Sequence, residues 1–255
     1  MVEPGDEVLI AINGVFGTRM AEVAKRAGAK VITTEDDWGK AVDPNKIEKA
    51  LKSNPDVKIV GFVHAETSTG ALSNAAEICR LAKDNNAMTI VDTVTSLGGV
   101  PVNVDVWGAD SVYSGSQKCL SCPPGLSPVS FSDQAVDNIL NRKTPVQSWL
   151  LDLSLVAGYW QGDQESGART YHHTAPVNAL MGLHEALRKI VQEGLENVWA
   201  RHKLVSDIIV SGMEKMGFSM LVEKSIRLPE LLTIKLPEDI NDSVVRNKLL
   251  NEYNI

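Results

Sequence analysis

Three polar segments of this 255-residue chain follow apolar runs that are typical of buried strands. Residues 64–70 (HAETSTG) follow one such run, Asp92 ends the next, and residues 114–118 (SGSQK) follow a third. In open α/β sheets, ligands bind outside the carboxyl ends of the strands. We therefore expect these three segments to converge on one site.

Lys118 and Asp92 are the two residues of this group with the most specific chemistry. A lysine amine can form a Schiff base with an aldehyde, and a carboxylate at a strand end can hold a pyridine nitrogen protonated. Together they suit pyridoxal 5'-phosphate (PLP). Spacing alone leaves the alternative open, because a lysine in a Ser/Gly-rich loop is usually solvated and a strand-end aspartate is usually a turn or a cap.

Other motifs favour structural roles. Cys119 and Cys122 have the spacing of a redox pair or half a metal site, but no second pair follows, so we expect small buried residues. His172 and His173 are adjacent, and we expect them to point in different directions and to serve as hydrogen-bonding residues, without a metal. His64 is expected to be a strand-end hydrogen bonder. The spacing of a nucleotide-binding glycine motif is absent from the sequence.

Composition excludes several classes of protein. A net charge of -7 and a pI near 5.3 argue against a surface for nucleic acid or an anionic membrane. No apolar run approaches the roughly 18 residues that span a bilayer. The chain has 3 cysteines, which suits free thiols in a reducing compartment. We expect an intracellular protein, in the cytoplasm, peroxisome or mitochondrion, with small-molecule substrates.

Apolar β-branched runs alternate with helical periods in the first 140 residues, which predicts an α/β fold with a mainly parallel sheet. Continuous apolar runs indicate strands that are buried on both faces. The predicted strands cover residues 7–12, 29–34, 57–64, 87–92, 110–115 and 126–132, and the predicted helices cover residues 18–28, 43–54 and 74–86.

The pattern changes after residue 140. Two long amphipathic helices are predicted over 176–194 and 195–217, with Gly194 and Gly217 as their stops. Two short strands and a helix over 242–253 then begin an α+β unit. We divide the chain into a large domain, residues 1–195, and a spacer helix with an incomplete small domain, residues 196–255.

Six strings of the sequence carry a resemblance to a known family. The chain is similar to class V aminotransferases of the alanine-glyoxylate and serine-pyruvate group, which includes 3-hydroxykynurenine transaminases. This resemblance implies the fold type I PLP-transferase architecture and covers essentially the whole chain. The strings are YSGSQK, VDTVTSLGG, HAETSTG, RKTP, RTYHHTAP and GLENVWARH.

The resemblance implies roles for Phe16 and for six further residues. Lys118 corresponds to the Schiff-base lysine and Asp92 to the partner of the pyridine nitrogen. Thr67 stands where the family commonly has a serine near the phenolic oxygen of PLP, and Gln117 lies near the phosphate. The resemblance further implies that Tyr171 and Thr174 reach the phosphate from the neighbouring subunit of a homodimer with shared active sites.

Phe16 departs from the family pattern. The family often has Trp in NG-x-W-G, where the ring stacks on the pyridine, and this chain reads NGVFG. A phenylalanine can still stack, with less area. The resemblance also implies that a glycine-rich phosphate turn lies upstream of residue 1 and a carboxylate-binding arginine beyond residue 255. We therefore expect a chain truncated at both ends and poorly active by itself.

The resemblance implies a transamination between alanine or serine and glyoxylate or pyruvate, in a ping-pong reaction through pyridoxamine phosphate. One alternative is a PLP lyase or desulfurase of the same fold, although Cys119 and Cys122 lie too near the lysine for a desulfurase. A second alternative is a truncated, non-catalytic dimerising chain.

Overall fold

The computed structural model describes residues 1–161 and 170–255. Its centre is a sheet of six strands in the order β2-β1-β3-β6-β7-β8. All neighbours in this sheet are parallel except β7 and β8, which are antiparallel. The strands are β1 (Glu7–Ile12), β2 (Lys30–Glu35), β3 (Val57–Val63), β6 (Met88–Asp92), β7 (Ser111–Tyr113) and β8 (Val129–Phe131). The mainly parallel α/β fold predicted from the sequence is confirmed.

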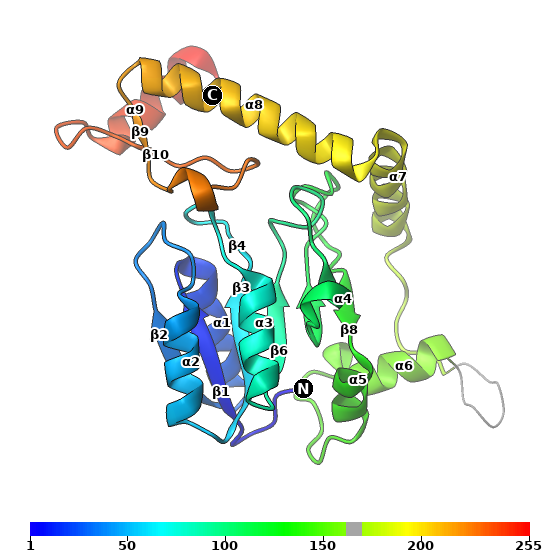
Figure 1. The fold of residues 1–255 in the computed structure, drawn as a ribbon. Coiled ribbons are helices and arrows are strands. Elements are labelled where there is room, and N and C mark those ends of the chain that lie inside the picture. The colour runs from blue at the N-terminus through cyan, green and yellow to red at the C-terminus, as the bar shows by residue number, and fades with distance from the viewer. Residues whose placement is uncertain (162–169) are drawn as a thin grey trace.

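Helices cover both faces of this sheet (Figure 1). On one face, Leu9 and Phe62 pack in a core that includes Ile47 of α2 (Pro44–Ser53) and Ile78 of α3 (Ala75–Asp84). On the other face, the smaller core of Val8, Ile10 and Ile59 contains Ala21 of α1 (Val15–Arg26). Successive residues of β1 therefore enter opposite cores, which is why the strand is apolar throughout.

Helix boundaries follow local hydrogen bonding. The Asp43 side chain caps α2 by accepting a hydrogen bond from the Asn45 amide at 2.9 Å, and Asn74 caps α3. The first of the three helices differs from the prediction, because α1 begins at Val15 and not at Thr18. Gly14, its N-cap, provides no side-chain cap. The sequence signal for this start is therefore weak.

Short elements that the sequence analysis did not identify connect the larger ones. A hairpin of two-residue strands follows β3 and carries the HAETSTG segment. These elements are β4 (Ala65–Glu66), β5 (Ala71–Leu72), α4 (Val104–Trp107), α5 (Asp133–Leu140), η1 (Trp149–Leu151) and α6 (Leu153–Gln161).

The C-terminal third contains the two predicted long helices and a small two-stranded antiparallel sheet. In Figure 1, α8 runs above the end of the sheet where β4 lies. No helix among the described residues has the length and apolarity needed to cross a membrane. The elements are α7 (Val177–Glu193), α8 (Leu195–Lys215), β9 (Ser219–Met220), η2 (Lys224–Ile226), β10 (Ile234–Lys235), α9 (Asp242–Lys248) and the π-helical turn η3 (Leu249–Tyr253).

The C-terminal segment braces the β4–β5 hairpin. The Leu228 amide donates to the Gly70 carbonyl at 2.9 Å, and the Thr233 hydroxyl donates to the Thr69 carbonyl at 2.8 Å. Gly70 has a φ of +85°, and a Cβ there would lie 2.8 Å from the Leu231 carbonyl oxygen. The position thus requires glycine for both its backbone conformation and its space.

We predict that Gly70→Ala lowers the free energy of unfolding more than Gly5→Ala does. Gly5 has a similar φ of +90° but has no atom within 4 Å of its added Cβ. Gly5→Ala therefore measures left-handed strain alone, about 1–2 kcal/mol, and Gly70→Ala adds the overlap with Leu231. Urea unfolding of both variants tests this. Equal losses would show that the contact with Leu231 relaxes at no cost.

Candidate active site

Asp92 ends β6 at the carboxyl edge of the sheet and is only 5% exposed. Parallel pairing of β6 and β7 sets Asp92 beside Tyr113. The Tyr113 hydroxyl donates to Oδ2 of Asp92 at 2.7 Å, and the Val94 amide donates to Oδ1 at 2.8 Å. The carboxylate is thus held in one orientation by two donors.

The electrostatic surroundings of Asp92 raise its pKa above the usual value. Burial is the main cause, and the Glu66 carboxylate adds to it, while the hydrogen bonds from Tyr113 and Val94 act in the opposite direction. Burial in this site also raises the pKa of Tyr113, and the negative charge of Asp92 raises it further. A cationic group facing Asp92 would therefore be favoured, because it would stabilise the ionised carboxylate.

A cavity of about 410 Å³ opens beside Asp92. Four of the seven residues singled out from the sequence line it, together with Tyr113 and Arg19. The four are Phe16, Thr67, Asp92 and Gln117. The three polar segments therefore converge as expected, since Thr67, Asp92 and Gln117 each come from a different one.

Phe16 lies in the first turn of α1, and Thr67 lies in the turn between β4 and β5. The Arg19 guanidinium lies 5.0 Å from the centre of the Phe16 ring, in a cation–π arrangement. The Thr67 hydroxyl forms a hydrogen bond with the Thr95 hydroxyl. The cavity thus has an aromatic ring, a hydroxyl and a buried carboxylate on its lining.

Lys118 is half-buried and follows Gln117 directly, but it is not among the residues that line the cavity. Its loop is fixed by main-chain hydrogen bonds, from Ser116 to Leu126 and from Cys122 to Ser116. The Lys118 carbonyl accepts a hydrogen bond from the Ser121 amide at 2.9 Å. The loop therefore holds Lys118 directly after Gln117, which does line the cavity.

Tyr171 and Thr174 lie away from this cavity within one chain. Their hydroxyls are hydrogen-bonded to each other at 2.7 Å, and Tyr171 is 69% exposed. Neither residue lines the cavity beside Asp92. Their predicted role across a subunit boundary stays a prediction.

The sequence model of the class V aminotransferase family matches residues 1–255, which is the whole chain. The chain belongs to the class V aminotransferase family. Members of this family are PLP-dependent enzymes, which confirms the cofactor predicted from the sequence.

Named relatives and a solved structure agree with this family. Alanine–glyoxylate aminotransferase of Oryctolagus cuniculus is 38% identical over 238 residues, which cover 93% of this chain and 60% of the relative. (S)-Ureidoglycine–glyoxylate transaminase of Bacillus subtilis is 34% identical and matches 100% of this chain and 64% of its own length. The crystal structure of alanine–glyoxylate aminotransferase from Nostoc sp. superposes with a TM-score of 0.93 at 44% identity, covering 100% of this chain and 66% of that one.

Two consequences follow for the class V aminotransferase chain. The superposition confirms the fold type I architecture. The chain also spans about three fifths of the length of the curated relatives it matches.

Sequence reasoning missed three side chains at this site: Tyr113, Glu66 and Arg19. Tyr113 is the last residue of a strand that was predicted, so its position as the neighbour of Asp92 follows once the two strands are known to pair. Glu66 lies in the HAETSTG segment that was expected at the site, but no role was predicted for it, and none was predicted for Arg19. Glu66 binds main-chain amides about 50 positions away in the chain, and the Arg19 guanidinium lies over the Phe16 ring.

The other candidate residues have structural roles. His64 is buried, its Nδ1 lies 2.9 Å from the Ser96 hydroxyl, and burial lowers its pKa to about 4, so the hydrogen-bonding prediction is confirmed. The expectation that His172 and His173 point apart is wrong, because their Nδ1 atoms lie 2.7 Å from each other. His172 also stacks on Trp149 at 4.0 Å.

The 3 cysteines are free thiols, as expected. Cys122 is buried, and Cys119 donates a hydrogen bond to the Thr95 carbonyl at 3.3 Å. Burial raises the pKa of the Cys119 thiol to about 12, and nearby Glu230 contributes. A thiol with such a pKa is a poor nucleophile.

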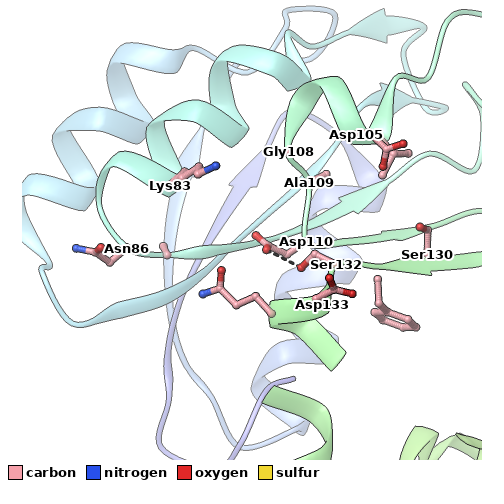
Figure 2. Close-up of a pocket in the computed structure, with 13 residues that line it drawn as sticks. Lys83, Asn86, Asp105, Gly108, Ala109, Asp110, Ser130, Ser132 and Asp133 are labelled. Carbon is pink, nitrogen blue, oxygen red and sulfur yellow. Dashed lines mark hydrogen bonds between the residues drawn. The ribbon is translucent and has the colours of Figure 1, made fainter. Parts of the chain in front are cut away.

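A larger cavity, of about 660 Å³, lies at the amino edge of the sheet (Figure 2). Its lining includes Lys83 and Asp110, which precede β6 and β7. Asp110 is already satisfied there, since Ser132 donates to its Oδ1 at 2.9 Å and the Thr89 amide to its Oδ2 at 2.9 Å. This cavity is at the opposite edge from Asp92, so its size does not make it the active site.

Glu230 is a buried carboxyl close to the lysine loop. Both of its oxygens lack a hydrogen-bond partner among the described residues, and one lies 2.9 Å from the position that a Cβ on Gly99 would take. Burial raises the pKa of Glu230 to about 7, against a smaller opposing effect of its own amide. The protonated form is therefore the one that this position stabilises.

We predict a pH-dependent loss of stability that Glu230→Gln removes. With a folded pKa of about 7 and an unfolded pKa of about 4.5, the native state holds the proton more tightly. Relative to Glu230→Gln, the wild type should be fully stable below about pH 4.5. It should lose roughly 3 kcal/mol as the pH rises from about 4.5 to about 7. Urea unfolding from pH 4 to pH 8 measures this, with the exposed Glu214→Gln as control. Parallel curves for wild type and Glu230→Gln would contradict it.

Proposed function

We propose that this chain carries the PLP-binding site of an aminotransferase that transfers an amino group from alanine or serine to glyoxylate or pyruvate, in a ping-pong reaction. The observation that carries the proposal is the buried Asp92 carboxylate, whose pKa is raised by burial, facing a cavity lined by Phe16 and Thr67. The names of its relatives, which include glyoxylate transaminases, support the choice of acceptor.

The residues around Asp92 fit PLP. A cavity of about 410 Å³ lies within the roughly 300–1,000 Å³ usual for small-molecule sites. Asp92 would hold the protonated ring nitrogen, Phe16 would stack on the ring, and Thr67 would donate to the phenolic oxygen. Gln117 would lie near the phosphate, and Lys118 would bind the aldehyde carbon through its amine. When bound, PLP supplies an electron-withdrawing ring that takes up the electron pair left by a broken bond at the substrate α-carbon.

Each side chain then has a defined task in the transfer. Asp92, oriented by Tyr113 and Val94, would keep a proton on the ring nitrogen of bound PLP. The Lys118 amine would act as the general base that takes the proton from the α-carbon of the amino acid and, once protonated, as the general acid that gives it back. Its flexible side chain, projecting from a loop fixed by hydrogen bonds, allows that short movement.

The proposed protein is a homodimer with shared sites. Tyr171 and Thr174 of each subunit would reach the cofactor phosphate bound by the other. Their exposure, and their position outside the cavity of their own chain, support this. We also propose that residues 1–195 form the large domain and that residues 196–255 form the spacer helix and part of the small domain.

A desulfurase is disfavoured for this chain. Such an enzyme needs a thiol that ionises readily on a movable loop. Cys119 is instead hydrogen-bonded to Thr95, and its pKa is raised to about 12.

We predict that borohydride reduction of the protein with PLP labels Lys118. We expect Lys118, which follows the cavity-lining Gln117, to bind the aldehyde, so Lys118→Ala should abolish the covalent label and leave weak, reversible binding. Peptide mapping after reduction checks this, with Lys83→Ala, at the far cavity, as control. A label that persists in Lys118→Ala and maps to another lysine would overturn the assignment.

We further predict that Asp92→Asn lowers the rate of transamination by at least about 100-fold, within the range of a lost proton-transfer group. A neutral amide does not stabilise a protonated ring nitrogen, while the lysine linkage should remain. Pyruvate formation from alanine and glyoxylate measures the rate. Asp105→Asn, an exposed residue at the far cavity, is the control. A rate for Asp92→Asn within about tenfold of wild type would mean that Asp92 only caps its strand.

A further inference from the structure

Glu66 is a fully buried carboxylate that no step of the proposed reaction uses. It ends β4 and is 0% exposed. Its Oε1 accepts from the Ser68 hydroxyl at 2.6 Å and from the Ser68 amide at 3.1 Å. Oε1 also accepts from the Phe16 amide at 3.4 Å, and Oε2 from the Gly17 amide at 3.4 Å. Every one of these partners is a donor, as a carboxylate requires.

Glu66 and Ser68 together replace the missing cap of α1. The first amides of a helix have no partner within it, and Gly14 offers no side chain to accept them. The Val15 amide instead donates to the Ser68 hydroxyl at 3.1 Å, and the next two amides donate to Glu66. The carboxylate also lies at the positive end of the helix dipole, where a negative charge is stabilised.

The close approach of these groups depends on glycine at position 14. A Cβ on Gly14 would lie 2.5 Å from Glu66 side-chain atoms and 2.5 Å from the Ser68 hydroxyl. The start of α1 is therefore shaped to receive this carboxylate.

The same contacts connect two walls of the cavity beside Asp92. Phe16 belongs to the turn that Glu66 holds, and Thr67 is the next residue after Glu66 in the chain. The charge of Glu66 also reaches the site, because it raises the pKa of Asp92 and of Tyr113. For both groups its effect is smaller than that of burial.

We propose that Glu66 is a positioning residue, which fixes the Phe16 ring relative to Thr67 and Asp92 and supplies a negative charge that favours a protonated nitrogen on bound PLP. The proposal deepens the proposed function and rests on it. Glu66 acts through the main chain of α1 and through its field, without contact with the substrate.

The first test needs no cofactor. In Glu66→Gln the side-chain shape is kept, but one acceptor oxygen becomes an NH₂ group that faces donors. Hydrogen exchange of the Phe16, Gly17 and Ser68 amides should become faster by about tenfold or more, with the centre of the sheet unchanged. Glu77→Gln, a partly exposed glutamate paired with Arg80 on α3, is the matched control.

The second test follows the absorbance of bound PLP against pH. Removing the negative charge should lower the pH at which the protonated form of the lysine–cofactor link is lost, by about half a unit or more. Binding of PLP should weaken by roughly tenfold. Ser68→Ala, which keeps the carboxylate and removes the acceptor of the Val15 amide, should speed exchange at Val15 and leave that pH nearly unchanged.

Unchanged exchange at residues 16, 17 and 68 in Glu66→Gln, or an unchanged pH of the absorbance transition, would overturn the positioning role. If the wild-type protein does not bind PLP, the proposed function is contradicted. The hydrogen exchange of the Phe16 and Gly17 amides would still decide whether Glu66 holds the start of α1. A pH shift of equal size in Ser68→Ala would show that shape, and not the charge of Glu66, controls the site.

Discussion

The parallel pairing of β3, β6 and β7 brings several chain segments to one edge of the sheet, and the site depends on this constraint. Because β6 and β7 end in register, Asp92 and Tyr113 lie side by side, and the hydroxyl can donate to the carboxylate. The sheet is covered by helices on both faces. Its edge is therefore the place where polar side chains from successive loops can meet around a cavity.

Two buried carboxylates at this edge are stabilised by donors and not by cations. Asp92 accepts from a phenol and an amide, and Glu66 accepts from the start of α1 and from Ser68. No ion pair to either one occurs among the described residues. Both carboxylates, where ionised, would favour a cationic ligand group in the cavity, whose lining also includes Arg19.

The sheet could be predicted because its strands are apolar on both faces, as Val8 and Leu9 illustrate by entering different cores. Asp92 could be singled out because polar residues at strand ends converge, whereas Thr67 and Gln117 were named individually only through the family resemblance. Register could not be predicted, so the contact of Tyr113 with Asp92 was missed. The start of α1 was missed because its cap, Glu66, comes from a distant hairpin, which local sequence does not reveal.

The most direct measurement is a crystal structure of the chain soaked with PLP. Our account predicts electron density continuous with the Lys118 amine, with the ring against Phe16 and its nitrogen within hydrogen-bonding distance of Asp92. Density for PLP in the larger cavity at the amino edge, or a ring attached to Lys118 with its nitrogen turned away from Asp92, would contradict the account.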